Sequence, residues 1–528
     1  MQAIWSFLAG LISTCRDSHA DCGPGGIRSD AGTSTLPTRV IDLESSDGPR
    51  LFITKEASTD LRSQPYTALS HCWGAGARHL TTTQANLEQM VREIPVKEMP
   101  QTYLDAFKVN QSLGVRYIWI DALCIIQDDR YDWQVESAKM CDIYRDAYCT
   151  IAANAAQSNG QGCFMEKHGL SLPTDSCRLV AEENGHRSAI VLLPPRPSWK
   201  NQILSSPLNS RAWVLQERLL SPRILHFAKD AIFWECSELK SSQFEPNGIP
   251  DVELLADPVS YTYALRNLTA AECARSAWLQ LVQHYTKLGI TKVEDRLPAL
   301  SGLAKMIQAK TEDTYVAGLW KSSLVEGLTW ALSGKDFKSE ELHNERPYTA
   351  PSWSWASTDR DLGFLTVTDM TKPIGSAKSA ADWDWRFDVE ILNFNIKLAG
   401  PDPTGQMLRG SITLSGHIQI LPVVTTRSLP VGSTDQIDPG NLERSLQPGI
   451  EAQGSANFIH LDYPKDPSIV SFPALRLCHR SPNDQAQTCL LVLEATGKAL
   501  DQYKRIGRAV LYGLAPVTEL DKRIIELV

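Results

Sequence analysis

Residues 117–153 read YIWIDALCIIQDDRYDWQVESAKMCDIYRDAYCTIAA: an apolar run, an acidic turn, a helical pattern and a second apolar run. Asp132 is expected to cap the helix, because a short carboxylate accepts hydrogen bonds from the first free backbone N–H groups. The residues that follow at steps of three or four share one helical face: Trp133, Glu136, Met140, Ile143 and Ala147. The stretch as a whole predicts a fold, and the single acid among apolar side chains marks a candidate functional site.

Apolar strands are expected on both sides of this helix. Residues 115–126 form a nearly continuous run rich in Ile and aromatic residues, which is typical of a central strand buried on both faces. Residues 66–70 and 148–153 predict two further strands, and a helix is expected between Pro100 and Gly114. Alternating strands and helices indicate a parallel α/β sheet, in which ligands bind beyond the carboxyl ends of the strands.

The length of 528 residues exceeds one ordinary core, so more than one domain is expected. The changing patterns predict a flexible segment at 1–36, an α/β domain at 37–240 with its core at 66–217, a mainly helical region with a PSWSWAS segment at 241–380, and a β-rich domain at 381–528. The last prediction rests on strict apolar–polar alternation after residue 383.

The charge, the apolar stretches and the cysteines indicate which partners and which cellular location to expect. The net charge of −9 disfavours binding to nucleic acid. The apolar stretch at residues 3–11 is too short to span a bilayer and lacks the basic flank of a signal peptide. The 12 cysteines include no CxxC pair, so we expect buried free thiols, no metal site and a cytoplasmic location.

Glu136 is the first candidate for chemistry. A carboxylate on an apolar helical face must find a partner, shift its pKa or serve a function. In the structural alternative, Glu136 pairs with Arg116 or Arg145, or accepts hydrogen bonds from backbone donors near the helix start. Both interpretations stay open at this stage.

Two predicted strand ends supply further candidates. His71 and Trp73 follow the strand at 66–70, and Asp121 lies late in the next one. Trp73 could stack on an aromatic ring of a ligand, His71 could line a pocket and Asp121 could hold ribose hydroxyls. The structural alternatives are a core tryptophan, a hydrogen-bonded histidine and an aspartate that fixes the turn after its strand.

Several motifs together resemble the fungal heterokaryon-incompatibility (HET) domain family. They are LSHCWG at 69–74, LGVRYIWIDALCIIQDD at 113–129, the DW..E...M..IY..A pattern at 132–147, RAWVLQERLLSPRILHF at 211–227 and APSWSWAS at 350–357. The resemblance assigns the α/β domain at 37–240 to this family.

The resemblance implies a fungal protein of non-self recognition that can trigger cell death when unlike cells fuse. The HET domain is also remotely similar to Toll/interleukin-1 receptor-type domains, some of which cleave NAD+. In those domains the catalytic Glu lies on a helix that a Trp-containing turn opens, and Trp133-Gln-Val-Glu136 matches that local arrangement.

The leading hypothesis therefore has Glu136 as the catalytic residue of an NAD+ glycohydrolase, with His71, Trp73, Asp121 and Trp133 binding the substrate. NAD+ would be a substrate, and no cofactor or metal is expected. One alternative is a non-enzymatic signalling module that acts through protein partners or self-association. Another is an enzyme or accessory protein of a secondary-metabolite pathway.

Overall fold

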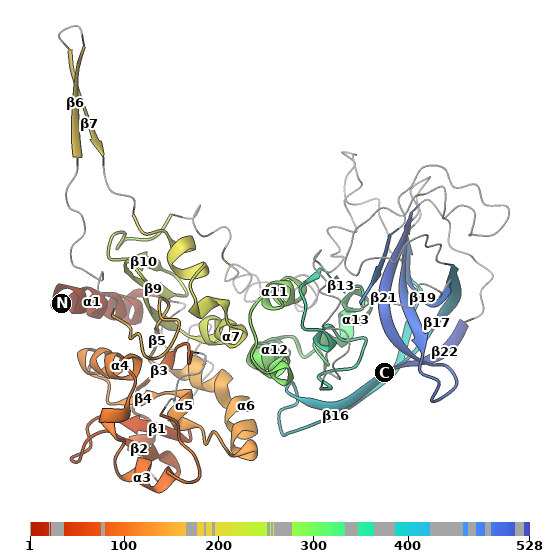
Figure 1. Ribbon diagram of the computed structural model, residues 1–528, viewed down its shortest axis with the longest axis horizontal. Helices are drawn as coiled ribbons and strands as arrows, with labels where there is room; N and C mark the ends of the chain where they lie inside the picture. The colour runs from red at the N-terminus through yellow and green to blue at the C-terminus, as the bar shows by residue number, and fades with distance from the viewer. Residues whose placement is uncertain are drawn as a thin grey trace. The chain divides into compact units, whose positions relative to one another are not determined.

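The computed structural model divides the chain into two compact units, Met1–Ser260 and Tyr261–Val528, and each is described by itself (Figure 1). The structure describes residues 2–20, 22, 36–56, 58–74, 80–164, 177–183, 186–192, 196–250, 254, 257, 277–332, 347–363, 386–422, 458–462, 471–480, 487–512 and 522–528. The segments expected at 1–36 and 241–380 therefore lie only partly within the described residues.

One mixed sheet forms the centre of the first unit (Figure 1). Its strands are β1 (Arg39–Asp42), β2 (Arg50–Ile53), β3 (Tyr66–Ser70), β4 (Tyr117–Trp119), β5 (Cys149–Ala152), β8 (Arg223–Phe227), β9 (Ile232–Cys236) and β10 (Lys240–Ser242). They lie in the order β10-β9-β8-β5-β3-β4-β1-β2. The central pairs β4–β3, β3–β5 and β5–β8 are parallel, as expected, whereas the outer pairs are antiparallel. A separate antiparallel hairpin consists of β6 (Cys177–Glu183) and β7 (His186–Leu192).

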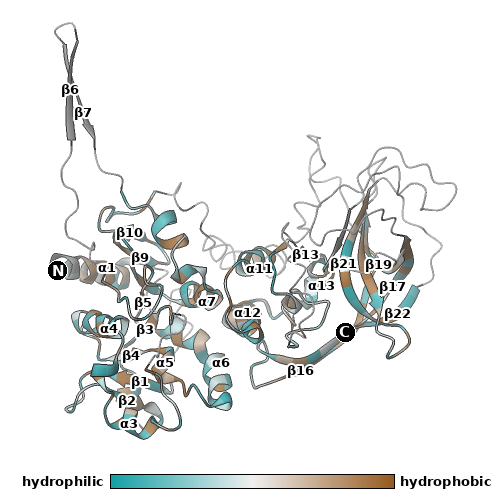
Figure 2. Cartoon of the chain, viewed as in Figure 1, coloured by the Kyte–Doolittle hydropathy of each residue, from teal (hydrophilic) through white to brown (hydrophobic). Residues whose placement is uncertain are grey.

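Helices flank this sheet (Figure 1). The α-helices are α1 (Gln2–Ser18), α2 (Thr59–Arg62), α3 (Leu87–Arg92), α4 (Gln101–Ser112), α5 (Asp121–Cys124), α6 (Arg130–Asp146) and α7 (Ala212–Leu220). Short 3₁₀ or π turns lie at η1 (Thr54–Glu56), η2 (Val96–Glu98), η3 (Lys200–Leu204) and η4 (Leu208–Ser210). Polar and apolar residues are interspersed along α4 and α6 (Figure 2), as on helices with one buried side.

Alternating side chains of β3 contact α4 and α6. The hydroxyl of Thr67 donates to the side-chain oxygen of Asn110 on α4. The hydroxyl of Tyr66 donates to the backbone oxygen of Ile143 on α6, at 2.7 Å. Because successive side chains of a strand point to opposite faces, α4 and α6 cover opposite faces of the sheet.

Helix α4 begins and ends as its sequence predicts. It starts directly after Pro100, which lies in extended backbone at φ −68° and ψ 154°. It ends at Gly114, whose φ of +67° is left-handed backbone that glycine adopts without steric cost.

Asp129, rather than Asp132, caps helix α6. Its carboxylate accepts hydrogen bonds from the backbone N–H groups of Tyr131 at 2.9 Å and Asp132 at 3.1 Å. The prediction of an Asp132 cap was wrong because that carboxylate has other partners. It binds Arg39 at 2.6 Å and accepts from the backbone N–H of Ile126 at 2.8 Å, tying the helix start to β1 and the preceding loop.

The apolar run at 115–126 is a short strand followed by one helical turn. Strand β4 covers Tyr117–Trp119 and helix α5 covers Asp121–Cys124, so the prediction of one long strand was wrong. The side chain of Asp121 accepts a hydrogen bond from the backbone N–H of Ala122 at 2.7 Å, which favours the helical turn. A strand and a helical turn that are buried on all sides are equally apolar, so the periodicity of apolar residues could not distinguish one from the other.

Part of the segment expected to be flexible is the helix α1. Its residues Leu8, Leu11, Ile12 and Cys15 are all buried, and their spacing of three and four gives one apolar face. Trp5 adds an edge-to-face ring contact with Phe164, with 6.1 Å between ring centroids. The helix is thus packed against the first unit, while residues 23–35 lie outside the described part of the chain.

The second unit begins with short helices and two-stranded sheets. The helical elements are α11 (Trp278–Tyr285), η6 (Val293–Asp295), α12 (Pro298–Thr311), η7 (Lys321–Ser323), α13 (Leu324–Gly327) and η9 (Trp355–Ser357). Strands β11 (Tyr315–Val316) and β12 (Leu319–Trp320) form one pair, and β13 (Ala331–Leu332) and β14 (Leu362–Gly363) form another.

Two tryptophans in this part converge on Gly318. Its carbonyl accepts from the indole N–H groups of Trp278 and Trp355, both at 2.8 Å. Its φ is +90°, and a Cβ at this position would lie 2.6 Å from the Trp355 ring nitrogen. The buried Trp355 of the PSWSWAS segment therefore requires glycine opposite it.

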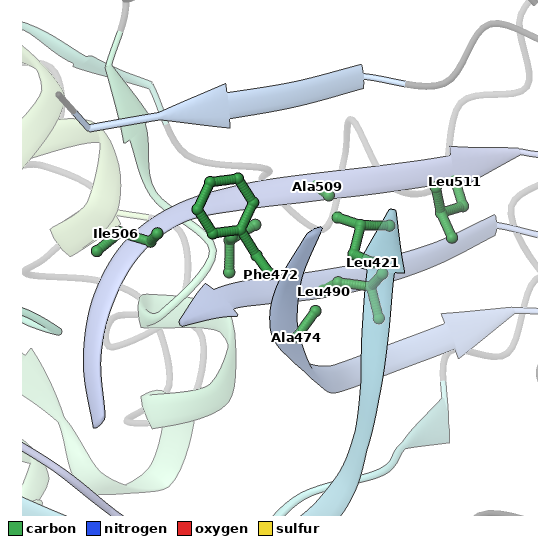
Figure 3. Packing of buried hydrophobic residues seen from close by; sticks show 8 residues of the cluster. Leu421, Phe472, Ala474, Leu490, Ile506, Ala509 and Leu511 are labelled. Atoms are coloured by element: carbon green, nitrogen blue, oxygen red, sulfur yellow. The ribbon is translucent and has the colours of Figure 1, made fainter. Parts of the chain in front are cut away.

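A second sheet makes the C-terminal part β-rich, as expected. Its strands are β15 (Arg386–Phe387), β16 (Glu390–Leu398), β17 (Met407–Pro422), β18 (Phe458–Leu461), β19 (Ser471–Arg480), β20 (Gln487–Ala495), β21 (Gln502–Tyr512) and β22 (Lys522–Leu527). Strand β17 pairs with both β19 and β22, so β17, β19, β20, β21 and β22 close into a ring. Figure 3 shows its core, which consists of Leu421, Phe472, Ala474, Leu490, Val492, Ile506, Ala509 and Leu511.

No helix in the described part of the chain has the length and apolar character needed to cross a membrane. This agrees with the expectation drawn from the apolar stretch at residues 3–11.

Replacing Asn110 by Ala should destabilise the first unit. The Asn110 amide donates to the carbonyls of Val115 at 2.9 Å and Tyr117 at 3.1 Å, and accepts from Thr67, all in the interior. Leaving these groups unpaired should cost roughly 3 kcal/mol. Hydrogen exchange of the β3 amides in the full chain measures this, with the exposed Gln111→Ala as control; equal protection in both variants would contradict the role of Asn110.

Candidate functional site

The site lies where the parallel strands β3 and β4 end. Tyr66, Ala68 and Ser70 share one face of β3, whereas Thr67 and Leu69 share the other, and His71 continues this second set. His71 accordingly makes an edge-to-face ring contact with Tyr103 of α4, at 5.2 Å between centroids. Ser70 instead contacts Glu217 of α7. The strand end thus presents polar groups to both faces of the sheet.

The structure brings together three of the residues selected from the sequence. The indole N–H of Trp73 donates to one carboxylate oxygen of Asp121 at 2.9 Å. The Nδ1 atom of His71 lies 3.9 Å from the other oxygen. Asp121 also accepts from the backbone N–H of Ala122, as its structural alternative anticipated. These contacts hold His71, Trp73 and Asp121 in one cluster at the strand end.

Glu136 lies in a different set of contacts. Only 1% of this residue is exposed. One carboxylate oxygen accepts from the Lys139 ammonium at 2.9 Å, and the same ammonium donates to the Thr38 hydroxyl at 2.8 Å. The other oxygen, Oε2, is buried without a hydrogen-bond partner among the described residues. Glu136 is therefore an ion-paired carboxylate with one open acceptor atom.

The arginines proposed as partners of Glu136 bind other acids. Arg116 forms two hydrogen bonds of 2.7 Å with Asp42 on β1. Arg145 binds Asp142 at 2.8 Å and Asp146 at 2.9 Å. Glu136 is ion-paired, as its structural alternative anticipated, but its partner is Lys139, one turn along the same helix, and neither of these arginines.

Trp133 extends toward α7. Its ring meets that of Trp213 edge to face, with 6.4 Å between the centroids. Trp133 and Glu136 are one turn apart on α6, so they share a helical face. The contact joins this face of α6 to the start of α7.

Glu217 is a carboxylate whose importance sequence analysis missed. It accepts from the Ser70 hydroxyl at 2.5 Å, and burial raises its pKa from 4.5 to about 7. Tyr144 and Arg211 oppose this shift, and the guanidinium of Arg211 also donates to the backbone oxygen of His71. The available signal was the pair of adjacent charged residues, Glu217 and Arg218, in the mostly apolar stretch AWVLQERLL.

A buried ionic network lies behind this site. Arg218 binds Glu235 at 2.8 Å and Asp257 at 2.7 Å. Lys240 also binds Asp257 at 2.8 Å, and His226 lies 2.9 Å from Glu235. Burial lowers the pKa of His226, so this histidine is a neutral structural group at pH 7.

Two motifs at the end of β3 have structural explanations. Burial raises the pKa of Cys72, which makes its thiol a poor nucleophile. Gly74 has φ +90°, and a Cβ there would lie 2.4 Å from the Cβ of Ser158. Close packing and left-handed backbone thus account for this glycine.

The second unit contains a polar pocket of about 950 Å³. Its lining includes Arg505, whose guanidinium lies 3.2 Å from the centroid of the Trp330 ring and binds Asp462 at 2.8 Å. Burial raises the pKa of Asp462 to about 6. Three further cations line this pocket, namely Arg360, Arg409 and Lys504. Sequence analysis did not single out these residues, because they come from segments far apart in the chain.

The central sheet and its helices define an α/β domain with polar groups at its strand ends. Residues 66–217, from β3 through α7, match the family model of the Heterokaryon incompatibility protein (HET). The chain therefore contains a HET domain, which confirms the resemblance drawn from its motifs. Comparison with curated proteins and with solved structures gave no match.

Glu217 should make folding stability depend on pH. Its pKa is about 7 in the folded chain and near 4.5 when unfolded, so the folded state binds more protons between these values. Stability due to this group is therefore full below about pH 4.5 and falls as pH rises through 7. Glu217→Gln should be more stable than the wild type at pH 8 by roughly 3 kcal/mol.

Thermal unfolding of the two proteins from pH 4.5 to 8 measures this difference. Glu88→Gln is the control, because the Glu88 side chain is 90% exposed. A difference between Glu217→Gln and wild type that stays constant over this pH range would contradict the assigned ionisation.

Proposed function

We propose that this protein is a heterokaryon-incompatibility-type effector that causes cell death by cleaving NAD+ at Glu136. The HET domain supports the general class. The observation that favours this chemistry is the buried, ion-paired Glu136 with its open oxygen. The remote similarity to Toll/interleukin-1 receptor-type domains adds a fold-level analogy. Action in the cytoplasm through protein partners or self-association belongs to the same proposal.

The reaction breaks the bond between the nicotinamide nitrogen and the anomeric carbon of ribose. The bonding electrons leave with nicotinamide, which becomes neutral, and positive charge develops on the ribosyl group. An ionised Glu136 would stabilise that charge. Water then bonds to the anomeric carbon and loses a proton, giving ADP-ribose. Because nicotinamide leaves without protonation, one carboxylate suffices.

Lys139 forms an ion pair with the Glu136 carboxylate in the resting protein. Its side chain is 44% exposed, whereas that of Glu136 is 2% exposed, so the pair joins a solvent-accessible cation to a buried carboxylate. Its bond to Thr38 fixes this arrangement. In the proposal, the substrate reaches Glu136 when the Lys139 ammonium moves aside, and His71, Trp73, Asp121 and Trp133 bind the remainder of NAD+.

Glu136→Gln should abolish NAD+ loss while the protein stays folded. The neutral amide cannot stabilise a ribosyl cation, so the rate should fall roughly a hundredfold or more. Lys139→Ala should raise the rate, because it uncovers the carboxylate. The measurement is the NAD+ content of matched cells after induction of each full-length chain.

Asp142→Asn is the matched control, because Asp142 lies on the same helix and its side chain is 57% exposed. It should deplete NAD+ as the wild type does. A folded Glu136→Gln chain that depletes NAD+ at the wild-type rate would exclude this catalytic residue. Unchanged NAD+ with both wild type and Lys139→Ala would exclude the reaction.

The polar pocket favours a second candidate function, the binding of a small anionic molecule. Such a site fits a ligand-controlled effector or an accessory protein of a metabolite pathway. Arg409 and Lys504 are exposed, whereas Arg505 is buried, so the lining contains both exposed and buried cations. Asp462 contributes a buried acceptor, Oδ1, with no hydrogen-bond partner among the described residues. A ligand with both anionic and hydroxyl groups satisfies both features.

Binding of citrate and of inorganic pyrophosphate to the full chain tests this function by calorimetry. Arg409→Ala should weaken binding roughly tenfold or more, because it removes a charge-assisted contact. Arg523→Ala should bind like the wild type, because Arg523 pairs with Asp501 and does not line the pocket. Equal affinity in both variants, or no binding of either probe, would refute the anion site.

A further inference from the structure

Three cysteines and one histidine meet at one edge of the first unit. Cys15 lies in the last turn of α1, and His19 and Cys22 follow it along the chain. Cys236 is the last residue of β9. The three sulfur atoms and one imidazole nitrogen all lie within 4.8 Å of one another. The fold thus gathers four metal-binding side chains from two segments far apart in the sequence.

The spacing of these atoms fits a tetrahedral metal site. With Zn–S bonds of about 2.3 Å, two sulfurs of a tetrahedron lie about 3.8 Å apart. The Sγ of Cys236 already lies 3.4 Å from the Nδ1 of His19. Because the four ligand atoms lie within 4.8 Å of one another, each needs to move by only a fraction of that distance to bind one central ion. Rotation about side-chain bonds can supply that movement.

The surroundings of the cluster are suited to thiolates. The Arg223 guanidinium donates to the Sγ of Cys15 at 3.3 Å, and its other end donates to the carbonyl of Cys22 at 2.8 Å. The backbone N–H of Leu239 donates to the Sγ of Cys236 at 3.3 Å. Three thiolates, one neutral imidazole and Zn²⁺ carry a net charge of −1, which Arg223 would balance. Such outer-shell donors orient and stabilise metal ligands.

We propose that Cys15, His19, Cys22 and Cys236 bind one structural zinc ion. Four protein ligands fill a tetrahedron and leave no position for substrate, so the site is structural rather than catalytic. All three cysteines are buried, which protects the thiolates from solvent. The ion would fasten α1 to the strand pair β8–β9, where Cys236 lies opposite Arg223.

Sequence analysis missed this cluster because of the spacing of its residues along the chain. The absence of a CxxC pair led us to expect no metal site. The fourth ligand, Cys236, lies 217 residues beyond His19 along the chain, so only the folded structure brings it to the others. A Cys-x₃-His-x₂-Cys pattern at 15–22 was the available local signal.

Elemental analysis of the purified full chain tests the proposal. We expect one zinc per chain in the wild type and in Cys163→Ser, which replaces a buried cysteine outside the cluster. Cys22→Ser and Cys236→Ser should lose most of the metal, because each removes one ligand. Zinc removal from the wild type by a chelator should also lower the melting temperature and the hydrogen-exchange protection of α1.

Cobalt substitution in the wild type gives a measurement that does not depend on the folding of variants. Tetrahedral Co²⁺ with three thiolates should show strong visible absorption and thiolate-to-metal charge-transfer bands. Iron in place of zinc, a disulfide between two of these cysteines, or folded metal-free protein that binds neither Zn²⁺ nor Co²⁺ would overturn the assignment.

Discussion

The first unit depends on the complete burial of strand β3. Every residue of Tyr66–Ser70 is buried, with a parallel strand on each side and a helical layer on each face. Its side chains therefore contact two helical layers, and successive residues along the strand contact opposite layers. Tyr66 and Ser70 bond to α6 and α7, while Thr67 bonds to α4. Side chains from several helices and strands therefore meet at the end of β3 without a long loop.

The carboxylates near this point have different surroundings. Asp121 is partly exposed and accepts hydrogen bonds from the Trp73 indole and from the backbone N–H of Ala122. Glu136 is buried beside a single lysine. Glu217 is buried with a hydroxyl as its bonded partner, so burial dominates and raises its pKa. One domain thus holds acids in unlike surroundings, and burial raises the pKa of one of them, Glu217.

Sequence patterns predicted the helices and strands whose ends are marked by particular residue types. They missed the features that depend on contacts between residues far apart in the chain. The limits of α4 followed from Pro100 and Gly114, and β3 followed from its apolar run. The cap of α6 was misplaced by three residues, because Asp132 is occupied by Arg39, a residue of another strand. His71, Trp73 and Asp121 were found because strand ends are predictable. The pairing of Lys139 with Glu136 follows the i,i+3 rule for helices, and sequence analysis overlooked it. The raised pKa of Glu217 and the contact between Cys236 and His19 depend instead on packing between segments far apart in the chain.

The ring of strands in the second unit has a consequence for the order of folding. Strand β22 lies between β21 and β17, and its pairing joins Ile412 to Leu527. The ring therefore cannot close until the ribosome has released residues 522–527, whereas every strand of the first sheet lies within the first 242 residues. Closure of such distant pairs is slow because a long loop must be ordered first. Until then β17 and β21 lack the strand that pairs with both of them, and unpaired strand edges of this kind promote aggregation.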